Sequence, residues 1–277
     1  IKNNLNDLSS LSGCKNNIYV TKEKPVEVAK NIDLVTNLSL IRPINKAIIE
    51  QLSYNSCIAL MWEPWEFRAE DIDRKACEKY KVPIIGTNES NPNLNTLHAV
   101  GLLAVKLLME RKVVIYGLHI LLLGSDPFGK NIGKILETLG AKITYIKNAK
   151  DTIKDELINN FDAVIMAENR INKDLIKTCN PNLYRYIGDN KIELIHISGL
   201  INYDDLKKYG IKKYPSRNTS FGYMTETTAY LGNKPVVDLH TGGLHAASIV
   251  CNHRKKGYSI KDSIKASVSS GYGLKLE

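Results

Sequence analysis

A short turn at residues 124–129, called the glycine turn below, has the residue types for binding phosphate groups. Its sequence, GSDPFG, follows the apolar run HILLL and precedes a lysine and an amphipathic stretch that predicts a helix. A turn between a strand and a helix presents backbone N–H groups at the helix N-terminus, where phosphates bind. The stretch therefore predicts either a nucleoside-triphosphate loop or a dinucleotide loop.

The two alternatives each lack one residue. A triphosphate loop needs Ser or Thr after the lysine to hold Mg²⁺, and Asn131 stands there. A dinucleotide loop needs three glycines, of which Gly124 and Gly129 fill the first and third places while Asp126 fills the second. A carboxylate there brings bulk and negative charge close to a diphosphate. We expect a dinucleotide fold in which the loop is displaced outward, the affinity is weak or the nucleotide has been lost.

The strand after this helix gives the second indication about a cofactor. It runs into Lys147, Asn148 and Lys150 instead of the acid that binds ribose hydroxyls in NAD proteins. These lysines could hold a 2′-phosphate, which slightly favours NADP over NAD, or they are ordinary surface charges. The predicted cofactor-binding residues are Gly124, Ser125, Asp126, Pro127, Phe128, Gly129, Lys130, Lys147, Ser198 and Gly199.

Residues 61–68, MWEPWEFR, form what we call the tryptophan loop. Two tryptophans, two glutamates and an arginine in eight residues are unusual for a surface loop, because exposed aromatic rings reduce solubility unless something covers them. The loop is either a substrate pocket or a contact between lobes or subunits. Its glutamates would suit a substrate with an amine or several hydroxyls. The predicted substrate-binding residues are Trp62, Glu63, Trp65, Glu66, Arg68, Asn88 and Glu89.

Short apolar runs alternate with helical patterns along the whole chain. This alternation predicts an α/β fold of two lobes, each a mainly parallel sheet flanked by helices, the second a Rossmann-type doubly wound domain. We expect residues 1–92 and 246–277 to form the substrate lobe and residues 93–245 the dinucleotide lobe, with a long helix over 93–111. The predicted strands are NNIYV, IDLVTNLS, CIALMW, VPIIGTN, HILLLG, AKITYI, FDAVIMA, IELIHIS and PVVDLH.

Composition argues against several classes of protein. The net charge of the 277 residues is +9, but the lysines are scattered, so we expect no nucleic-acid partner. The longest mainly apolar run, residues 99–109, contains Lys106 and is shorter than the about 20 residues that span a bilayer. The first residues lack the apolar core of a signal peptide. We therefore expect a cytoplasmic protein that does not enter the membrane.

The cysteines and histidines predict no metal site. Five cysteines stand at wide spacings without a CxxC pair, which favours reduced and mostly buried thiols over disulfides or zinc ligands. His240, His245 and His253 match no standard zinc spacing.

Four ordered segments within residues 33–249 resemble the D-isomer-specific 2-hydroxyacid dehydrogenases, the family of phosphoglycerate and formate dehydrogenases. They are EDIDRKACEKYKVPIIGTNES with LNTLHAVGLLAVKLLME, the glycine turn, IELIHISGLINYDDL, and PVVDLHTGGLHAASIV. The resemblance implies hydride transfer between NAD or NADP and a small polar 2-hydroxy or 2-oxo acid in the cleft between the lobes. It also implies a homodimer built on the helix near residues 95–110.

The resemblance also implies three catalytic groups. His240 matches the family's acid/base histidine, on an expected loop with Gly242 and Gly243, although a capping or core histidine is the alternative. Glu226 is the candidate for the acid that tunes it. The family's arginine has no counterpart at the matching Ser198-Gly199 turn, so we expect Arg68 to replace it, with Arg217 and Arg170 as further candidates.

Two rival functions stay open beside the oxidoreductase. One is a binding or regulatory protein that kept the fold and lost the chemistry, which Asp126 and the missing arginine favour. The other is a non-redox biosynthetic enzyme, such as a lyase or a cyclase, with a retained nucleotide.

Overall fold

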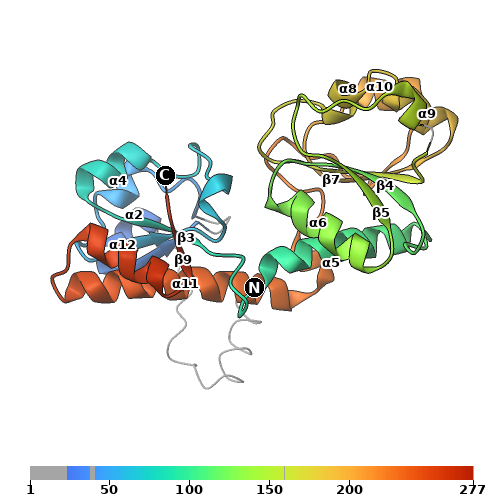
Figure 1. Ribbon diagram of the computed structural model, residues 1–277. Helices are drawn as coiled ribbons and strands as arrows, with labels where there is room; N and C mark the ends of the chain where they lie inside the picture. The colour runs from blue at the N-terminus through green and yellow to red at the C-terminus, as the bar shows by residue number, and fades with distance from the viewer. Residues whose placement is uncertain (1–23, 38–40, 159, 277) are drawn as a thin grey trace, which may run out of the picture.

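The structure is a computed structural model that describes residues 24–37, 41–158 and 160–276. These residues form two α/β lobes, each with its own sheet, and the helices α5 (Thr96–Glu110) and α11 (Asn233–Lys255) run between them (Figure 1). The predicted fold class is confirmed. The predicted strand NNIYV lies outside the described residues.

The first lobe is built on a four-stranded sheet. Its strands β1 (Leu34–Thr36), β2 (Cys57–Ala59) and β3 (Ile84–Thr87) are parallel, and β9 (Gly273–Lys275) pairs antiparallel with β3. The C-terminal segment therefore returns to the first sheet. The other elements of this lobe are α2 (Pro25–Val28), η1 (Ala29–Asn31), α3 (Lys46–Ile49), η3 (Pro64–Glu66), α4 (Arg74–Tyr80) and α12 (Ile260–Ser269).

The second lobe has a parallel five-stranded sheet in the order β5-β4-β6-β7-β8. Helices α5 and α6 cover one face of this sheet and α8 to α10 cover the other, with a separate apolar core beneath each layer. The elements are β4 (His119–Leu123), α6 (Pro127–Thr138), β5 (Lys142–Ile146), α7 (Asp155–Ile158), β6 (Ala163–Ala167), α8 (Leu175–Cys179), α9 (Leu183–Asp189), β7 (Glu193–Ser198), α10 (Tyr203–Lys208), β8 (Lys213–Tyr214) and η4 (Thr228–Leu231).

Strand order in the second sheet fixes where a ligand would be expected. The chain leaves β4 on one side to form β5 and then crosses to the other side to form β6, so the order reverses beside β4. Ligands of doubly wound sheets bind outside the carboxyl ends of the strands at such a switch point. The glycine turn follows β4 and therefore lies at that place.

The last predicted strand is wrong. PVVDLH lies inside α11, a helix of 23 residues. Pro235 is in the first turn of this helix, where the missing N–H has no intrahelical partner to lose. The expected loop at Gly242 and Gly243 is also wrong, because both glycines are buried in the helix. A Cβ on Gly243 would lie 2.8 Å from Thr87 Oγ1 and 3.0 Å from the Leu60 carbonyl oxygen, so glycine lets α11 pack closely on the first lobe.

Helix α11 also bears on the predicted division into lobes. It packs on β2 and β3 of the first sheet, and the predicted boundary between residues 245 and 246 falls in its middle. The exact position of the boundary between the two lobes stays a prediction.

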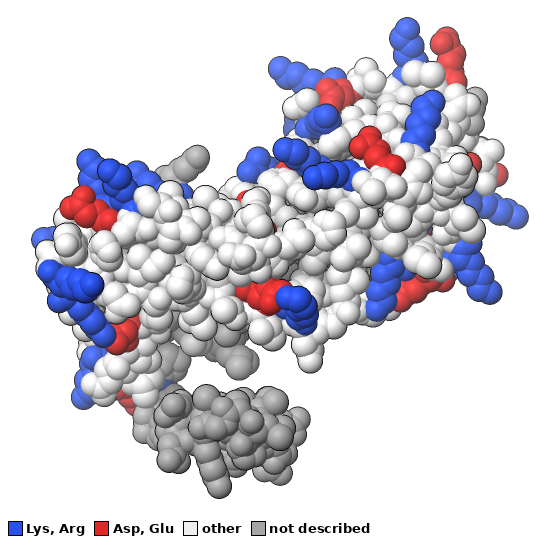
Figure 2. Space-filling model, turned by 60° about the horizontal axis from the view of Figure 1, so that its bottom comes forward, with Lys and Arg blue, Asp and Glu red and all other residues white. Residues whose placement is uncertain are grey.

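The described thiols agree with the sequence-based expectation. Cys57, Cys77, Cys179 and Cys251 are free and buried. On the face shown in Figure 2, Lys and Arg side chains are spread over both lobes with acidic side chains among them. No helix within the described ranges is both long enough and apolar enough to cross a membrane.

Candidate site between the two lobes

The glycine turn is held tightly against the end of β6. Gly124 has its Cα against the Ala167 carbonyl oxygen, where no Cβ would fit, and a Cβ on Gly129 would collide with the Tyr145 hydroxyl. Close backbone packing therefore requires glycine at position 124, whereas at position 129 the nearest atom is the end of the Tyr145 side chain. Pro127 is the first residue of α6, a position that proline favours.

Asp126 caps the helix that opens after the turn. Its Oδ1 accepts hydrogen bonds from the amides of Phe128 and Gly129, at 2.8 Å and 3.4 Å, and its Oδ2 accepts from the backbone and side-chain nitrogens of Asn169, at 2.8 Å and 3.1 Å. The residue is 2% exposed. An aspartate at this N-cap position accepts hydrogen bonds from N–H groups that have no partner within the helix.

Glu168, the residue after β6, lies beside Asp126 and is fully buried. Its Oε2 accepts a 2.6 Å hydrogen bond from the Ser125 amide, and its Oε1 accepts from the amides of Arg170 and Ile171 at 2.5 Å and 2.8 Å. Burial and the nearby Glu168 charge raise the pKa of Asp126. Sequence analysis did not single out Glu168, although its place directly after the buried strand FDAVIMA was a usable signal.

A nicotinamide dinucleotide does not fit the glycine turn in this arrangement. The fold offers the diphosphate of such a cofactor the amides at the start of α6. Here Asp126 and Glu168 already accept hydrogen bonds from those amides. A diphosphate would also meet two buried carboxylates, which repel it.

The remaining predicted cofactor residues are dispersed around this turn. Lys130 and Lys147 are exposed, and the Lys147 ammonium lies 4.9 Å from the centre of the Tyr145 ring. Ser198 is buried with an Oγ that has no hydrogen-bond partner, and the Gly199 carbonyl oxygen lies 2.9 Å from His196 Nε2. The preference for NADP over NAD stays a prediction.

The tryptophan loop of the first lobe contacts the glycine turn of the second. The Trp65 indole packs edge-on against Phe128, with ring centroids 5.4 Å apart, and the Arg170 guanidinium lies 4.9 Å from the Trp65 ring. Trp65 Nε1 donates a 2.7 Å hydrogen bond to Glu63 Oε2. The loop was expected to be either a substrate pocket or a contact between lobes or subunits. For Trp65 the structure shows a contact between lobes.

Three glutamates predicted to bind substrate form an acidic cluster near this contact. Glu63 and Glu89 are 6% and 5% exposed. Burial raises the pKa of Glu89 to about 7, with the Glu63 charge as the next cause. Burial, and then the charge of Glu89 and a hydrogen bond with it, raise the pKa of Glu66 well above its ordinary value, and Asp126 adds to this. Asn88 does not belong to this cluster. Its Nδ2 donates a hydrogen bond to the Gly271 carbonyl oxygen.

Arg68 belongs to a second, electropositive cluster in the first lobe. Its guanidinium lies 4.9 Å from the Trp62 ring and 4.2 Å from the ring of Tyr223, a residue of the second lobe. Its Nε is 3.4 Å from Asp71 Oδ2, but the alignment does not make a hydrogen bond. Arg42 Nη1 donates to the same Asp71 oxygen at 3.3 Å. Two guanidinium groups therefore share one carboxylate.

This cluster contains buried donors without acceptors. Within the described residues, Asn37 Nδ2, Trp62 Nε1 and Arg68 Nη1 are inaccessible to solvent and have no hydrogen-bond partner. Asn37 follows β1 and is fully buried, with its Oδ1 accepting from the Met61 amide at 2.9 Å. It lies inside the predicted strand IDLVTNLS, so the sequence pattern gave no signal for it, and sequence analysis missed it.

His240 and Glu226 are not brought together by any described interaction. His240 is half-buried on α11, and burial lowers its pKa while a hydrogen bond with the Val236 backbone partly offsets this. A tuning acid would raise that pKa. Glu226 lies instead near Tyr230, whose pKa is raised first by a hydrogen bond with Glu110 and only last by the Glu226 charge. The catalytic roles of His240, Glu226 and Arg68 stay predictions, and the exposed Arg217 lies beyond β8.

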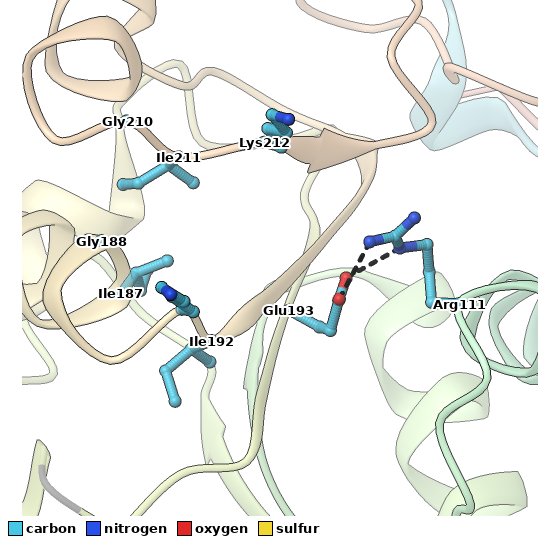
Figure 3. A pocket seen from close by; sticks show the side chains of 9 residues that line it. Arg111, Ile187, Gly188, Ile192, Glu193, Gly210, Ile211 and Lys212 are labelled. Atoms are coloured by element: carbon cyan, nitrogen blue, oxygen red, sulfur yellow. Dashed lines mark hydrogen bonds and ion pairs between the residues drawn. The ribbon is translucent and has the colours of Figure 1, made fainter.

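Of two pockets within the described residues, one borders this region and the other lies away from it. One of about 490 Å³ borders the tryptophan loop and is lined by Trp65, Phe67 and Arg170 together with the end of β9. Another of about 320 Å³ lies at the opposite end of the second sheet, where Arg111 and Glu193 face each other across a two-pronged ion pair (Figure 3). The second pocket is at the amino ends of β7 and β8, away from the switch point.

Comparison with known proteins gives a likeness in structure. No protein-family model and no curated protein matches the chain. The D-lactate dehydrogenase of Lactobacillus jensenii, solved with NAD⁺, is 16% identical, with 84% of this chain and 87% of that chain covered at a TM-score of 0.53. The pyruvate reductase of Chlamydomonas reinhardtii is 15% identical, with 82% and 85% covered at a TM-score of 0.54. This chain has their two-domain fold.

The same fold is shared by a protein that is named as a synthase and not as a dehydrogenase or reductase. A dipicolinate synthase chain from Bacillus halodurans is 11% identical, with 84% of this chain and 83% of that chain covered at a TM-score of 0.52. The likeness therefore establishes the dehydrogenase fold of this chain and leaves its chemistry to the site itself.

Proposed function

We propose that this chain binds a small oxyanion-bearing metabolite, such as a carboxylic acid, between its lobes without a nicotinamide dinucleotide at the glycine turn. The observation that carries this proposal is the set of buried, unpartnered donors on Asn37, Trp62 and Arg68. A buried donor without an acceptor costs about 1–3 kcal/mol, so native proteins rarely keep several in one place. A ligand oxyanion would supply the missing acceptors.

Charge and shape in the cluster support an acidic ligand. Arg42 and Arg68 share Asp71, which leaves one net positive charge among the three side chains. The Arg68 guanidinium is flanked by the Trp62 and Tyr223 rings, which fix the plane of its fork. A planar guanidinium held in this way suits a carboxylate that accepts two parallel hydrogen bonds.

Calorimetric titration with a panel of 2-oxo acids, 2-hydroxy acids and inorganic phosphate tests the proposal. We expect at least one acid to bind, and Arg68→Ala to weaken it by about tenfold or more, because a charge-assisted pair is worth roughly 1.5–3 kcal/mol. Arg185→Ala, which removes an exposed arginine of the second lobe, is the control and should change nothing. Equal affinity in the two variants, or no binding by any acid, refutes the proposal.

A second candidate function is NAD- or NADP-dependent oxidation or reduction of a 2-hydroxy or 2-oxo acid. Its support is the shared fold with a D-lactate dehydrogenase that was solved with NAD⁺. Measuring the absorbance of NADH and NADPH with the same acids tests it. Turnover that disappears in His240→Ala would favour this candidate, whereas absence of turnover with every acid would remove it.

We also propose that the chain forms a homodimer, which is compatible with either candidate function. Leu102 and Met109 are 43% and 64% exposed on α5, one heptad apart, and such apolar side chains suit a helix that packs on a second copy. Sedimentation of the wild type and of a Leu102→Glu/Met109→Glu variant tests it. A wild type that sediments as a monomer would contradict the proposal.

A further inference from the structure

We propose that Asp126 and Glu168 are built-in anions that take the position of a dinucleotide's diphosphate, so that the glycine turn excludes NAD and NADP. Both residues stand at the switch point of the second sheet, one after β4 and the other after β6. The inference is independent of the acid-binding site, because it concerns a different set of residues in the other lobe.

The backbone donors of the turn are the first support. A diphosphate at a helix N-terminus needs free N–H groups in the turn and the first helical residues. Ser125 N–H is bonded to Glu168, and the N–H groups of Phe128 and Gly129 are bonded to Asp126. Pro127, between them, has no N–H. The chain's own carboxylates therefore occupy three of the amide donors that a cofactor would use.

The two carboxylates are fixed from both sides, so they cannot swing aside without losing further bonds. Asp126 Oδ2 accepts from the Asn169 amide at 2.8 Å, and Glu168 Oε1 accepts from the Ile171 amide at 2.8 Å. The turn after β4 thus supplies an anion to the turn after β6, and the turn after β6 returns one to the turn after β4. This exchange gives acceptors to the bonded amides of both turns without a ligand, although the buried Ser125 Oγ has no partner.

Electrostatics point the same way. Asp126 and Glu168 are 2% and 0% exposed, and no lysine or arginine forms an ion pair with either within the described part of the chain. The carboxyl group of Glu66, from the first lobe, lies close enough to Asp126 that Asp126 adds to burial and Glu89 in raising the pKa of Glu66. A diphosphate would bring two more negative charges into this poorly solvated place.

Contact from the first lobe closes the turn on its outer side. Trp65 packs against Phe128, the second residue of α6, and Arg170 packs over Trp65. An outward shift of the turn, which would give a diphosphate room beside Asp126, would break this aromatic contact. The turn therefore cannot move outward to bind a cofactor beside the two carboxylates without losing the contact between Trp65 and Phe128.

Dinucleotide titrations test the inference. We expect NADH and NADPH fluorescence to show no saturable binding to the wild type up to millimolar concentration. In Asp126→Gly/Glu168→Gln the Phe128 and Gly129 amides lose their side-chain acceptor and two charges are removed, so the affinity should rise by at least about tenfold. Asp151→Asn is the matched control, because Asp151 also accepts from backbone amides, those of Lys147 and Asn148, but at the end of β5.

Thermal unfolding first establishes which variants are folded. A second experiment uses only the wild type. Inorganic pyrophosphate is added while the backbone amide resonances of Phe128 and Gly129 are followed by NMR. We expect no shift. The inference is overturned by a shift of these two resonances with pyrophosphate, by saturable binding of NADH to the wild type below millimolar concentration, or by a folded double variant that gains no affinity. Acid binding at Arg68 is scored separately, so either proposal can fail alone.

Discussion

Trp65 of the first lobe and Phe128 of the second meet edge to face, with their ring planes at 80° and their centroids 5.4 Å apart. This contact joins a loop that precedes α4 to the first turn of α6. It brings the tryptophan loop against the glycine turn.

Removing the aromatic ring of Phe128 should destabilise the protein. Phe128 is 4% exposed and belongs to the core beneath α5 and α6, so Phe128→Ala should lower the free energy of unfolding by about 3–5 kcal/mol. Tyr116→Ala is the control, because Tyr116 is 81% exposed and its loss should cost less than about 0.5 kcal/mol. Urea unfolding measures both. Equal losses would show that the ring at Phe128 does not pack as described.

Helix α11 should not tolerate a methyl group at Gly243. The Cβ of Gly243→Ala would lie 2.8 Å from Thr87 Oγ1 and 3.0 Å from the Leu60 carbonyl oxygen, so the helix must move away from β2 and β3. We expect a loss of about 1–3 kcal/mol, as for other overpacked sites. Thr241→Ala, at an exposed position of the same helix, should be nearly neutral. A Gly243→Ala variant as stable as wild type would mean that the helix is not seated this closely.

Stability should depend on pH through Glu89. Its folded pKa is about 7, above the ordinary value of 4.5, so the folded state retains a proton that the unfolded state has lost. The resulting stability is fully present below pH 4.5 and is lost as pH rises through 7. Glu89→Gln should remove this loss, worth on the order of 2–3 kcal/mol at pH 8.

Unfolding free energies at several pH values measure the effect of Glu89. Glu70→Gln, at an exposed position of the same lobe, should keep the wild-type pH profile. A Glu89→Gln profile that overlays the wild type between pH 4.5 and 7 would contradict the prediction.

The imidazole of His240 should titrate below its ordinary pKa of 6.5. Burial on α11 disfavours the charged ring, and the Val236 backbone offsets this only in part. NMR of the ring protons, assigned with a His240→Gln variant, gives the value. A pKa above 6.5 would indicate a carboxylate partner and would revive the catalytic pairing with Glu226.

Some errors of sequence analysis have a local physical cause. PVVDLH has the apolar and β-branched residues of a strand, and the following glycines look like a loop. In the structure these glycines face Thr87, Leu60 and Leu94, which are distant in sequence, and the close contact selects a helix. Local propensity was overridden by packing on a surface that the pattern cannot reveal.

Alternation of apolar runs with helical patterns was enough to determine the α/β class, most strand positions and the place of the glycine turn, because these depend on neighbours in sequence. The acceptor that satisfies the amides of that turn was decided only by tertiary structure. Asp126 could be read as an obstacle to a diphosphate, but Glu168 reaches Ser125 only because β4 and β6 are adjacent in the sheet. Likewise, Arg68 and Tyr223 meet because the chain folds one lobe against the other.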